Sequence, residues 1–205
     1  MKILLIRHTE QEYPQNSEGK QLVAVRTTPL SETGIRQAHE LAKRIGDMKL
    51  TPDALFGSPY VRTHQTATII KEELQIPVLE EMEDLGEVDP NDSEGHTLEE
   101  LNFIGSDVYA HPFGPNQESL EHLVVRLRKA FGKIYETAQK RGFKTIGIVS
   151  HGDPLAAMYW AIRNEGVPES YAEMKKDYYP QKGEALEFIY NKGSILRDSK
   201  RITIN

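Results

Sequence analysis

The stretch Ile3-Leu4-Leu5-Ile6-Arg7-His8 decides the fold, because an apolar run that ends on an arginine and a histidine is typical of a buried strand that stops at a ligand site. A second run, Thr145-Ile146-Gly147-Ile148-Val149-Ser150-His151, has the same form near the other end of the chain. Shorter apolar runs at residues 54–56 and 185–190 predict two more strands. We expect these four segments to form one sheet.

Helical patterns lie between the predicted strands. Apolar residues recur at helical spacing over residues 35–45 and 120–138. Two further helices are predicted to begin at Ser58-Pro59 and Asp153-Pro154, where an N-cap oxygen precedes a proline, and Asp153 is expected to be only a cap. Strands that alternate with helices predict an α/β fold, a three-layer α/β/α sandwich around a mostly parallel central sheet, as one domain over residues 1–205.

The composition excludes several classes of protein. A chain of 205 residues is long enough for one hydrophobic core, and the absence of cysteine excludes disulfides and a cysteine nucleophile. The net charge of −6 argues against binding to nucleic acid, which requires a basic face. The apolar run before Arg7 is too short for a signal peptide, and no stretch has the length of a membrane span. We therefore expect a cytoplasmic protein with neither nucleic acid nor membrane as a partner.

Side chains suited to one reaction follow three of the predicted strands. Arg7 and His8 follow the first, Arg62 the second and His151 the third. A transferring phosphoryl group carries its charge on three oxygens, so its transfer requires cationic hydrogen-bond donors and an aligned nucleophile. Guanidinium groups bind phosphate oxygens in pairs, and a neutral imidazole can attack phosphorus to form a covalent intermediate. The set predicts phosphoryl transfer without a metal ion or another cofactor.

Four ordered segments resemble those of a known family. Arg7-His8-Thr9-Glu10 resembles the Arg-His-Gly-Glu signature of the histidine phosphatase superfamily, which includes the cofactor-dependent phosphoglycerate mutases. Residues 29–38 (PLSETGIRQA) resemble its Pro-Leu-(Ser/Thr)-x-x-Gly-x-x-Gln-Ala segment, and residues 58–67 (SPYVRTHQTA) its Ser-Pro-Leu-x-Arg-Ala-x-Gln-Thr-Ala segment. Ser150-His151-Gly152 is similar to its second histidine motif. Four matches in order are far more specific than any one of them.

This resemblance implies a phosphoglycerate mutase-like fold and a metal-independent phosphomonoester hydrolase of the phosphatase branch. It implies that His8 is the residue that becomes phosphorylated, and that Arg7, Arg62 and His151 hold the phosphoryl oxygens. The substrate would be a small-molecule phosphomonoester or a phosphoprotein. The sequence leaves the oligomeric state open.

The resemblance also implies a carboxylic acid that protonates the leaving oxygen and then activates water. Glu81, Glu83 and Glu87 are the candidates. We favour Glu87, because the family pattern Leu-x-Glu, then six residues, then Glu-Gly is matched by Leu85-Gly86-Glu87 and Glu94-Gly95.

The chain departs from the family pattern beside the first histidine. Thr9 stands where glycine is commoner, and Pro14 occupies the position of an asparagine that usually follows. Asn16 is a candidate substitute, and Arg26 and Gly152 are further candidates for contact with the substrate.

Residues 88–117 are predicted to form a cap or insertion segment. No lysine or arginine occurs from residue 72 to residue 125, where fifteen residues are acidic. We therefore expect an acidic or neutral wall around the leaving group, which favours a phosphatase over a mutase and a leaving group that is neutral, cationic or part of a basic protein segment. Tyr109, His111 and Phe113 are candidates for a lid over that group.

Three alternatives stay open at this stage. His8-x-Glu10 and His151-x-Asp153 together could bind zinc or iron, although a metal ion would leave the two arginines unexplained. A phosphoglycerate mutase-type phosphotransferase would return the phosphoryl group to a second hydroxyl. A weakly active phospho-ligand-binding regulatory module would keep the shape of the family with little turnover.

Overall fold

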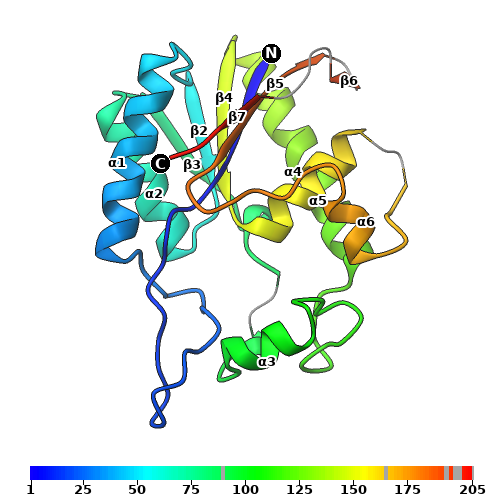
Figure 1. Ribbon diagram of the computed structural model, residues 1–205. Coiled ribbons are helices and arrows are strands. Elements are labelled where there is room, and N and C mark those ends of the chain that lie inside the picture. The colour runs from blue at the N-terminus through cyan, green and yellow to red at the C-terminus, as the bar shows by residue number, and fades with distance from the viewer. Residues whose placement is uncertain (89–90, 164–165, 192–193, 196–199, 205) are drawn as a thin grey trace.

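A central sheet of seven strands organises the chain, as seen in a computed structural model that describes residues 1–88, 91–163, 166–191, 194–195 and 200–204 (Figure 1). The strand order is β3-β2-β4-β1-β5-β6, and β7 pairs with β5. The pairs β2–β3, β2–β4 and β1–β4 are parallel, whereas β5 runs antiparallel to β1. The strands are β1 (Lys2–Arg7), β2 (Ala54–Gly57), β3 (Val78–Glu81), β4 (Thr145–Ser150), β5 (Ala185–Asn191), β6 (Ser194–Ile195) and β7 (Lys200–Ile202).

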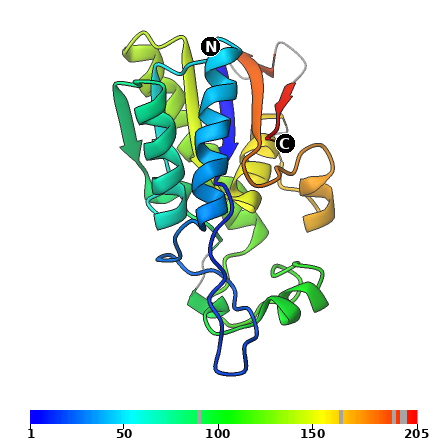
Figure 2. The same ribbon diagram turned by 60° about the vertical axis from the view of Figure 1, so that its left-hand side comes forward.

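Helices cover both faces of this sheet, with α1 and α2 on one side and α4 and α5 on the other (Figures 1 and 2). The helices are α1 (Glu32–Asp47), α2 (Val61–Glu73), α3 (Leu98–Phe103), α4 (Leu120–Lys140), α5 (Gly152–Arg163) and α6 (Tyr171–Lys175), with two 3-10 helices, η1 (Glu83–Leu85) and η2 (Asn91–Ser93). The predicted three-layer sandwich with a mostly parallel sheet is confirmed.

The core is split in two by the sheet, because successive side chains of a strand point to opposite faces. Ile3 and Leu5 of β1 pack with α4 and α5, whereas Leu4 and Ile6 pack with α1 and α2. All four side chains are fully buried. This explains why the strands at the centre of the sheet read as continuous apolar runs instead of an alternating pattern.

The two helix starts predicted from Ser-Pro and Asp-Pro are wrong in detail. The helix α2 begins at Val61, because the hydroxyl of Ser58 accepts the N–H of Tyr60 and bonds a histidine ring in place of capping a helix that starts at Pro59. The helix α5 begins at Gly152, so Asp153 lies inside its first turn. By contrast, Ser31 and Ser119 cap α1 and α4 through their side chains.

The segment between η1 and α4 lies beyond the carboxyl ends of β1, β2 and β4, next to the long loop that follows β1 (Figures 1 and 2). It contains η2 and α3, which is held by a capping box between Thr97 and Glu100. Residues 89–90 of the predicted cap segment, and residues 197–199 and 205 of the C-terminal stretch, lie outside the described residues. Among the helices of the described chain, none is long and apolar enough to cross a membrane.

Candidate active site

The carboxyl ends of three strands bring together four side chains that are far apart in the sequence. Arg7 pairs in register with Ser150 across β1 and β4, so His8 and His151 follow at the same edge of the sheet. Their ring centroids lie 5.2 Å apart. Arg62 reaches this edge from the first turn of α2, where its side chain is buried. The four residues predicted to handle a phosphoryl group therefore form one cluster.

The imidazole of His8 is held as a neutral base with one free nitrogen. Its Nδ1 lies 2.7 Å from the carbonyl oxygen of Thr9, which can only accept, so Nδ1 carries the proton and Nε2 has the lone pair. Burial, followed by the positive charges of Arg62 and Arg7, holds the pKa of His8 well below its usual 6.5. A neutral imidazole with a free Nε2 is the form that can attack phosphorus.

The three side chains predicted to bind phosphate each retain a buried donor with no hydrogen-bond partner among the described residues. These donors are Nε of Arg7, Nε of Arg62 and Nδ1 of His151. Each arginine is fixed by another nitrogen, Arg7 on the carbonyl of Pro180 and Arg62 on the carbonyl of Val25, both at 2.8 Å. Buried donors are normally paired, so three orphans in one cluster point to an anion as their partner.

The tautomer of His151 follows from its contact with Ser58. The Ser58 hydroxyl lies 2.9 Å from Nε2 of His151 and accepts the N–H of Tyr60, so its own proton is available to His151. The ring proton then resides on Nδ1, which lies 3.8 Å from Oε2 of Glu87. Burial, together with Arg62 and His8, lowers the pKa of His151 well below 6.5. His151 is thus a neutral donor.

Glu87 is the one of the three candidate acids that faces this cluster. Its side chain is 27% exposed, and its Oε1 accepts the N–H of Val88 at 3.0 Å. Loss of hydration, and then repulsion by Asp153, raises its pKa from 4.5 to about 7. Glu81 and Glu83 lie elsewhere, bound to His64 and Arg26. A carboxyl with a pKa near neutrality is suited to both giving and taking a proton.

Residues 3–182 of the chain match the model of the histidine phosphatase superfamily (branch 1). The chain belongs to the histidine phosphatase superfamily.

Relatives that bear the name of phosphatases cover most of the chain. PhoE of Bacillus subtilis, described as an uncharacterized phosphatase, is 34% identical over 169 residues, which are 82% of this chain and 79% of PhoE. Phosphoserine phosphatase 1 of Hydrogenobacter thermophilus is 28% identical over 166 residues, 79% of this chain and 76% of that protein. The alpha-ribazole phosphatase of Shigella flexneri shares the fold, with a TM-score of 0.72 and 23% identity over 95% of this chain and 93% of its own. The family and these relatives support phosphatase activity.

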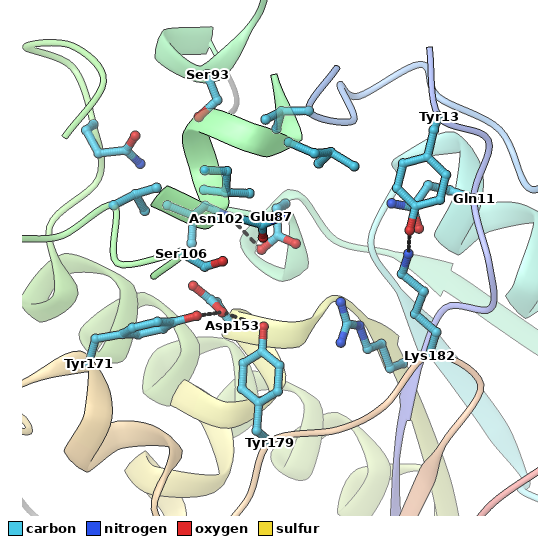
Figure 3. Close-up of a pocket in the computed structure, with 17 residues that line it drawn as sticks. Gln11, Tyr13, Glu87, Ser93, Asn102, Ser106, Asp153, Tyr171, Tyr179 and Lys182 are labelled. Carbon is cyan, nitrogen blue, oxygen red and sulfur yellow. Dashed lines mark hydrogen bonds between the residues drawn. The ribbon is translucent and has the colours of Figure 1, made fainter. Parts of the chain in front are cut away.

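A cavity of about 440 Å³ opens beside the cluster of arginines and histidines (Figure 3). Arg7, Glu87, Asp153 and Lys182 supply its charged side chains. The remaining wall comes largely from residues 88–117 and is uncharged, formed by Val88, Ser93, Leu98, Leu101, Asn102, Ser106, Val108 and Gln117. Of the acidic or neutral wall expected from the sequence, the neutral form is the one observed among the described residues of this segment, because none of their acids lines the cavity.

Asp153 is the site residue that sequence reasoning assigned wrongly. Its carboxylate caps no backbone group but accepts hydrogen bonds from the hydroxyls of Tyr109 at 2.8 Å and of Tyr171 and Tyr179 at 3.0 Å. Burial raises the pKa of Asp153, and the three phenols oppose that rise. The tyrosines come from three separate segments, so no local pattern in the sequence announced the cluster.

Lys182 is a second residue that the sequence analysis did not select. It lines the cavity and donates to the hydroxyl of Tyr13. Burial and the nearby charge of Arg7 lower its pKa from 10.5 to about 8. Its position just before β5, beside the loop that carries Pro180, was the available signal.

Hydrogen bonds to backbone carbonyl groups hold η1 and the start of the loop that carries Glu87. Ser150 donates to the carbonyl of Leu85 at 2.7 Å, and Nη1 of Arg126 donates to those of Asp84 and Gly86 at 2.9 and 3.1 Å. The sequence did not predict a role for Arg126, because it lies in α4, whose apolar stripe indicates ordinary core packing.

Two of the further candidates for substrate contact are engaged elsewhere. Oδ1 of Asn16 accepts the N–H groups of Glu18 and Lys20 at 3.0 Å, which closes the turn of its own exposed loop. The guanidinium of Arg26 forms two hydrogen bonds with Glu83. Neither side chain lines the cavity.

Gly152 and Thr9 both lie beside the cluster, and lack of space explains the glycine. A β-carbon at residue 152 would come within 2.6 Å of the Tyr179 hydroxyl and 3.1 Å of Cζ of Arg7, so only glycine permits this approach. Thr9, at the position where glycine is commoner, is buried, and its N–H donates to Thr66 at 3.3 Å.

The three aromatic candidates for a lid are arranged differently from one another. Tyr109 points to Asp153, Phe113 stacks on His96 with ring centroids 4.1 Å apart, and His111 is exposed. As for the metal alternative, the described residues contain no cluster of three or more His, Asp or Glu side chains that could hold an ion.

Proposed function

We propose that this protein is a phosphomonoester hydrolase that transfers the phosphoryl group of its substrate to Nε2 of His8 and then to water. The observation that carries the proposal is the set of unpartnered buried donors on Arg7, Arg62 and His151 beside a neutral His8. Two guanidinium groups and an imidazole N–H match the charge that spreads over the phosphoryl oxygens during transfer.

In the first step, Nε2 of His8 attacks phosphorus, the N–P bond forms and the bond from phosphorus to the ester oxygen breaks. Protonated Glu87 gives its proton to the departing oxygen, so the leaving group departs as an alcohol. The pKa of about 7 supports this role, because much of Glu87 holds its proton near neutral pH. Burial that keeps His8 unprotonated supports the nucleophilic role.

In the second step, ionised Glu87 takes a proton from a water molecule as that water attacks phosphorus. The N–P bond breaks, inorganic phosphate forms, and His8 regains its lone pair while Glu87 regains its proton. Nδ1 of His8 keeps its bond to the Thr9 carbonyl throughout, which holds the ring in place for both in-line attacks.

Hydrolysis is better supported than a mutase reaction. A mutase must hold a second anionic group of its substrate while the phosphoryl group returns to another hydroxyl. Among the described residues, the cavity wall from residues 88–117 carries no cation, and Lys182 is the one lysine that lines the cavity, on the side of Arg7. Isomerisation of a phosphoglycerate with stimulation by a bisphosphate primer would favour the mutase instead.

Replacing His8 tests the proposal. His8→Ala should lower kcat for p-nitrophenyl phosphate by roughly a thousandfold or more, because it removes the imidazole that forms the covalent intermediate. The wild type, denatured during turnover of a labelled ester in the presence of EDTA, should carry an acid-labile phosphoryl label that His8→Ala lacks. His39→Ala, an exposed histidine paired with Glu73, is the matched control and should retain both.

Turnover retained by His8→Ala would contradict the phosphohistidine route. Loss of activity in EDTA would favour the metal alternative. Wild-type turnover too feeble to measure with any aryl or alkyl phosphate would favour a phospho-ligand-binding regulatory module.

A further inference from the structure

The carboxylate of Asp153 lines the cavity together with the phenols of Tyr171 and Tyr179 (Figure 3). Tyr109 bonds the same carboxylate without lining the cavity. The hydroxyls of Tyr171 and Tyr179 both donate to Oδ1, and that of Tyr109 donates to Oδ2. In the catalytic steps proposed above, Asp153 transfers no proton and contacts no phosphoryl oxygen, and acts only by raising the pKa of Glu87. A carboxylate in the wall of a substrate cavity needs an explanation of its own, since burying it costs stability.

The oxygen atoms of Asp153, Tyr171 and Tyr179 can accept hydrogen bonds, but none of them has a proton left to donate. A carboxylate only accepts, and each phenol has already given its single proton to Asp153. The oxygens of Tyr171 and Tyr179, which also line the cavity, thus present lone pairs. A group bound there must bring donors.

A cation of this chain already lies over the ring of Tyr171, and another lies over the ring of Tyr179. Nζ of Lys175 lies 3.6 Å from the ring centroid of Tyr171, and the guanidinium of Arg7 lies 5.6 Å from that of Tyr179. The cluster therefore offers its oxygen edge to a ligand and not an open aromatic cage, so N–H donors suit it better than a quaternary ammonium.

The cluster lies within the reach of a small leaving group from the phosphate-binding donors. A β-carbon at Gly152 would approach both the Tyr179 hydroxyl and Cζ of Arg7 to about 3 Å, so these two groups flank the same glycine. Tyr179 in turn bonds Asp153. A substituent two carbons beyond the ester oxygen can thus approach Asp153 while the phosphoryl group lies on Arg7.

We propose that Asp153, with Tyr171 and Tyr179, is the specificity site for the leaving group and selects substrates that carry a primary ammonium close to the phosphoester. This inference rests on the proposed hydrolase function and names its substrate class, the phosphate esters of amino alcohols. The described residues of 88–117 that line the cavity are uncharged and add no competing charge.

A series of four esters of similar size tests the inference without any variant. The esters are 2-aminoethyl phosphate, 2-hydroxyethyl phosphate, propyl phosphate and 2-phosphoglycolate, which place an ammonium, a hydroxyl, a methyl and a carboxylate at corresponding positions. We expect kcat/KM for 2-aminoethyl phosphate to exceed that for propyl phosphate by roughly tenfold or more, because hydrogen bonds to charged groups are among the strong ones. The hydroxyl ester should lie between them and 2-phosphoglycolate should be the poorest.

Asp153→Asn should bring the ratio of 2-aminoethyl phosphate to propyl phosphate close to one. Glu99→Gln, which removes one negative charge from exposed α3 outside the cavity, is the matched control and should keep the wild-type ratio. A purely structural role for Asp153 would lower kcat/KM for all four esters alike and leave the ratio unchanged, which would overturn the inference.

The two proposals fail in different ways. If the wild type hydrolyses p-nitrophenyl phosphate and forms the label on His8 but shows no preference for the ammonium ester, the specificity assignment is wrong and the hydrolase stands. If no ester is hydrolysed and no label forms, both are overturned.

Discussion

At the scale of single residues, the site depends on the protonation of two groups that lie beside the same arginines. Burial and positive charge keep His8 unprotonated, whereas burial and the neighbouring Asp153 keep Glu87 protonated to a higher pH than usual. Burial disfavours the charged form of either group, which lowers the pKa of a base and raises that of an acid. The same environment thus sets both groups in the states that the proposed first step requires.

The raised pKa of Glu87 predicts how the rate depends on pH. kcat/KM for an alkyl phosphate should fall as pH rises through about 7, because Glu87 then loses the proton that it gives to the leaving oxygen. Glu87→Gln should lower kcat/KM by roughly 10²- to 10⁴-fold and remove this alkaline limb. Glu83→Gln is the matched control, because Glu83 is exposed and pairs with Arg26. This variant should keep the alkaline limb of the pH profile.

The raised pKa of Glu87 also predicts a change in stability. Between pH 4.5 and about 7 the folded protein holds the proton more tightly than the unfolded chain, so the free energy of unfolding should fall as pH rises through this window. Urea unfolding should therefore find Glu87→Gln more stable relative to the wild type at pH 8 than at pH 4.5. An equal difference at both values would mean that Glu87 is not the group with the raised pKa.

At the scale of elements, the loop after η1 places Glu87 and depends on α4 for its position. Arg126 of α4 donates to two carbonyls of this loop and pairs with Glu118, whose side chain is only 7% exposed. Glu118 lies at the end of the segment that walls the cavity. One guanidinium therefore connects the loop of the proposed catalytic acid with the segment that walls the cavity.

Arg126→Met tests this connection. It should lower kcat by roughly tenfold through misplacement of Glu87, while the inhibition constant for vanadate, which depends on Arg7 and Arg62, should change little. The free energy of unfolding should fall by up to about 3–5 kcal/mol, because the buried Glu118 loses its guanidinium partner and keeps only His122. The double variant with Glu118→Gln should regain stability but not turnover. If turnover returns together with stability, Arg126 is only a structural residue.

At the scale of the whole molecule, the groups proposed to bind phosphate join segments from most of the chain. Arg7 is tied to Pro180 near the C-terminal strands, and Arg62 is tied to Val25 in the first long loop. An anion bound between them would hold the ends of β1, β4 and α2 together. Binding to the folded state alone stabilises that state in proportion to the logarithm of ligand concentration.

Inorganic phosphate should therefore raise the melting temperature of the protein. At 100 times its dissociation constant the added free energy of unfolding would be about 2.7 kcal/mol. Arg62→Met should abolish this increment, whatever its own melting temperature, while Arg36→Met on the exposed face of α1 should keep it. An increment of equal size in both variants would place the anion outside the cluster.

The sequence by itself determined the sandwich and the cluster of Arg7, His8, Arg62 and His151. Apolar runs and helical periodicity are local features of the sequence. Parallel strands must end at a common edge of the sheet, so the residues that follow them lie close together whatever conformation the loops adopt. The edge strand β3 and the short helix α3 escaped prediction because they bury too little to show a pattern. The helix α6 escaped prediction because its five residues are too few to repeat one.

Only the tertiary structure decided which glutamate faces the histidines, what Asp153 contacts, and where Arg126 and Lys182 point. A dense run of acids permits several registers along the chain, and burial beside His151 distinguishes Glu87 from its neighbours. The phenols on Asp153 come from positions 18, 26 and 44 residues away. Contacts of this kind form only when separate segments close around one point, because side-chain hydrogen bonds depend on distance in space and not along the chain.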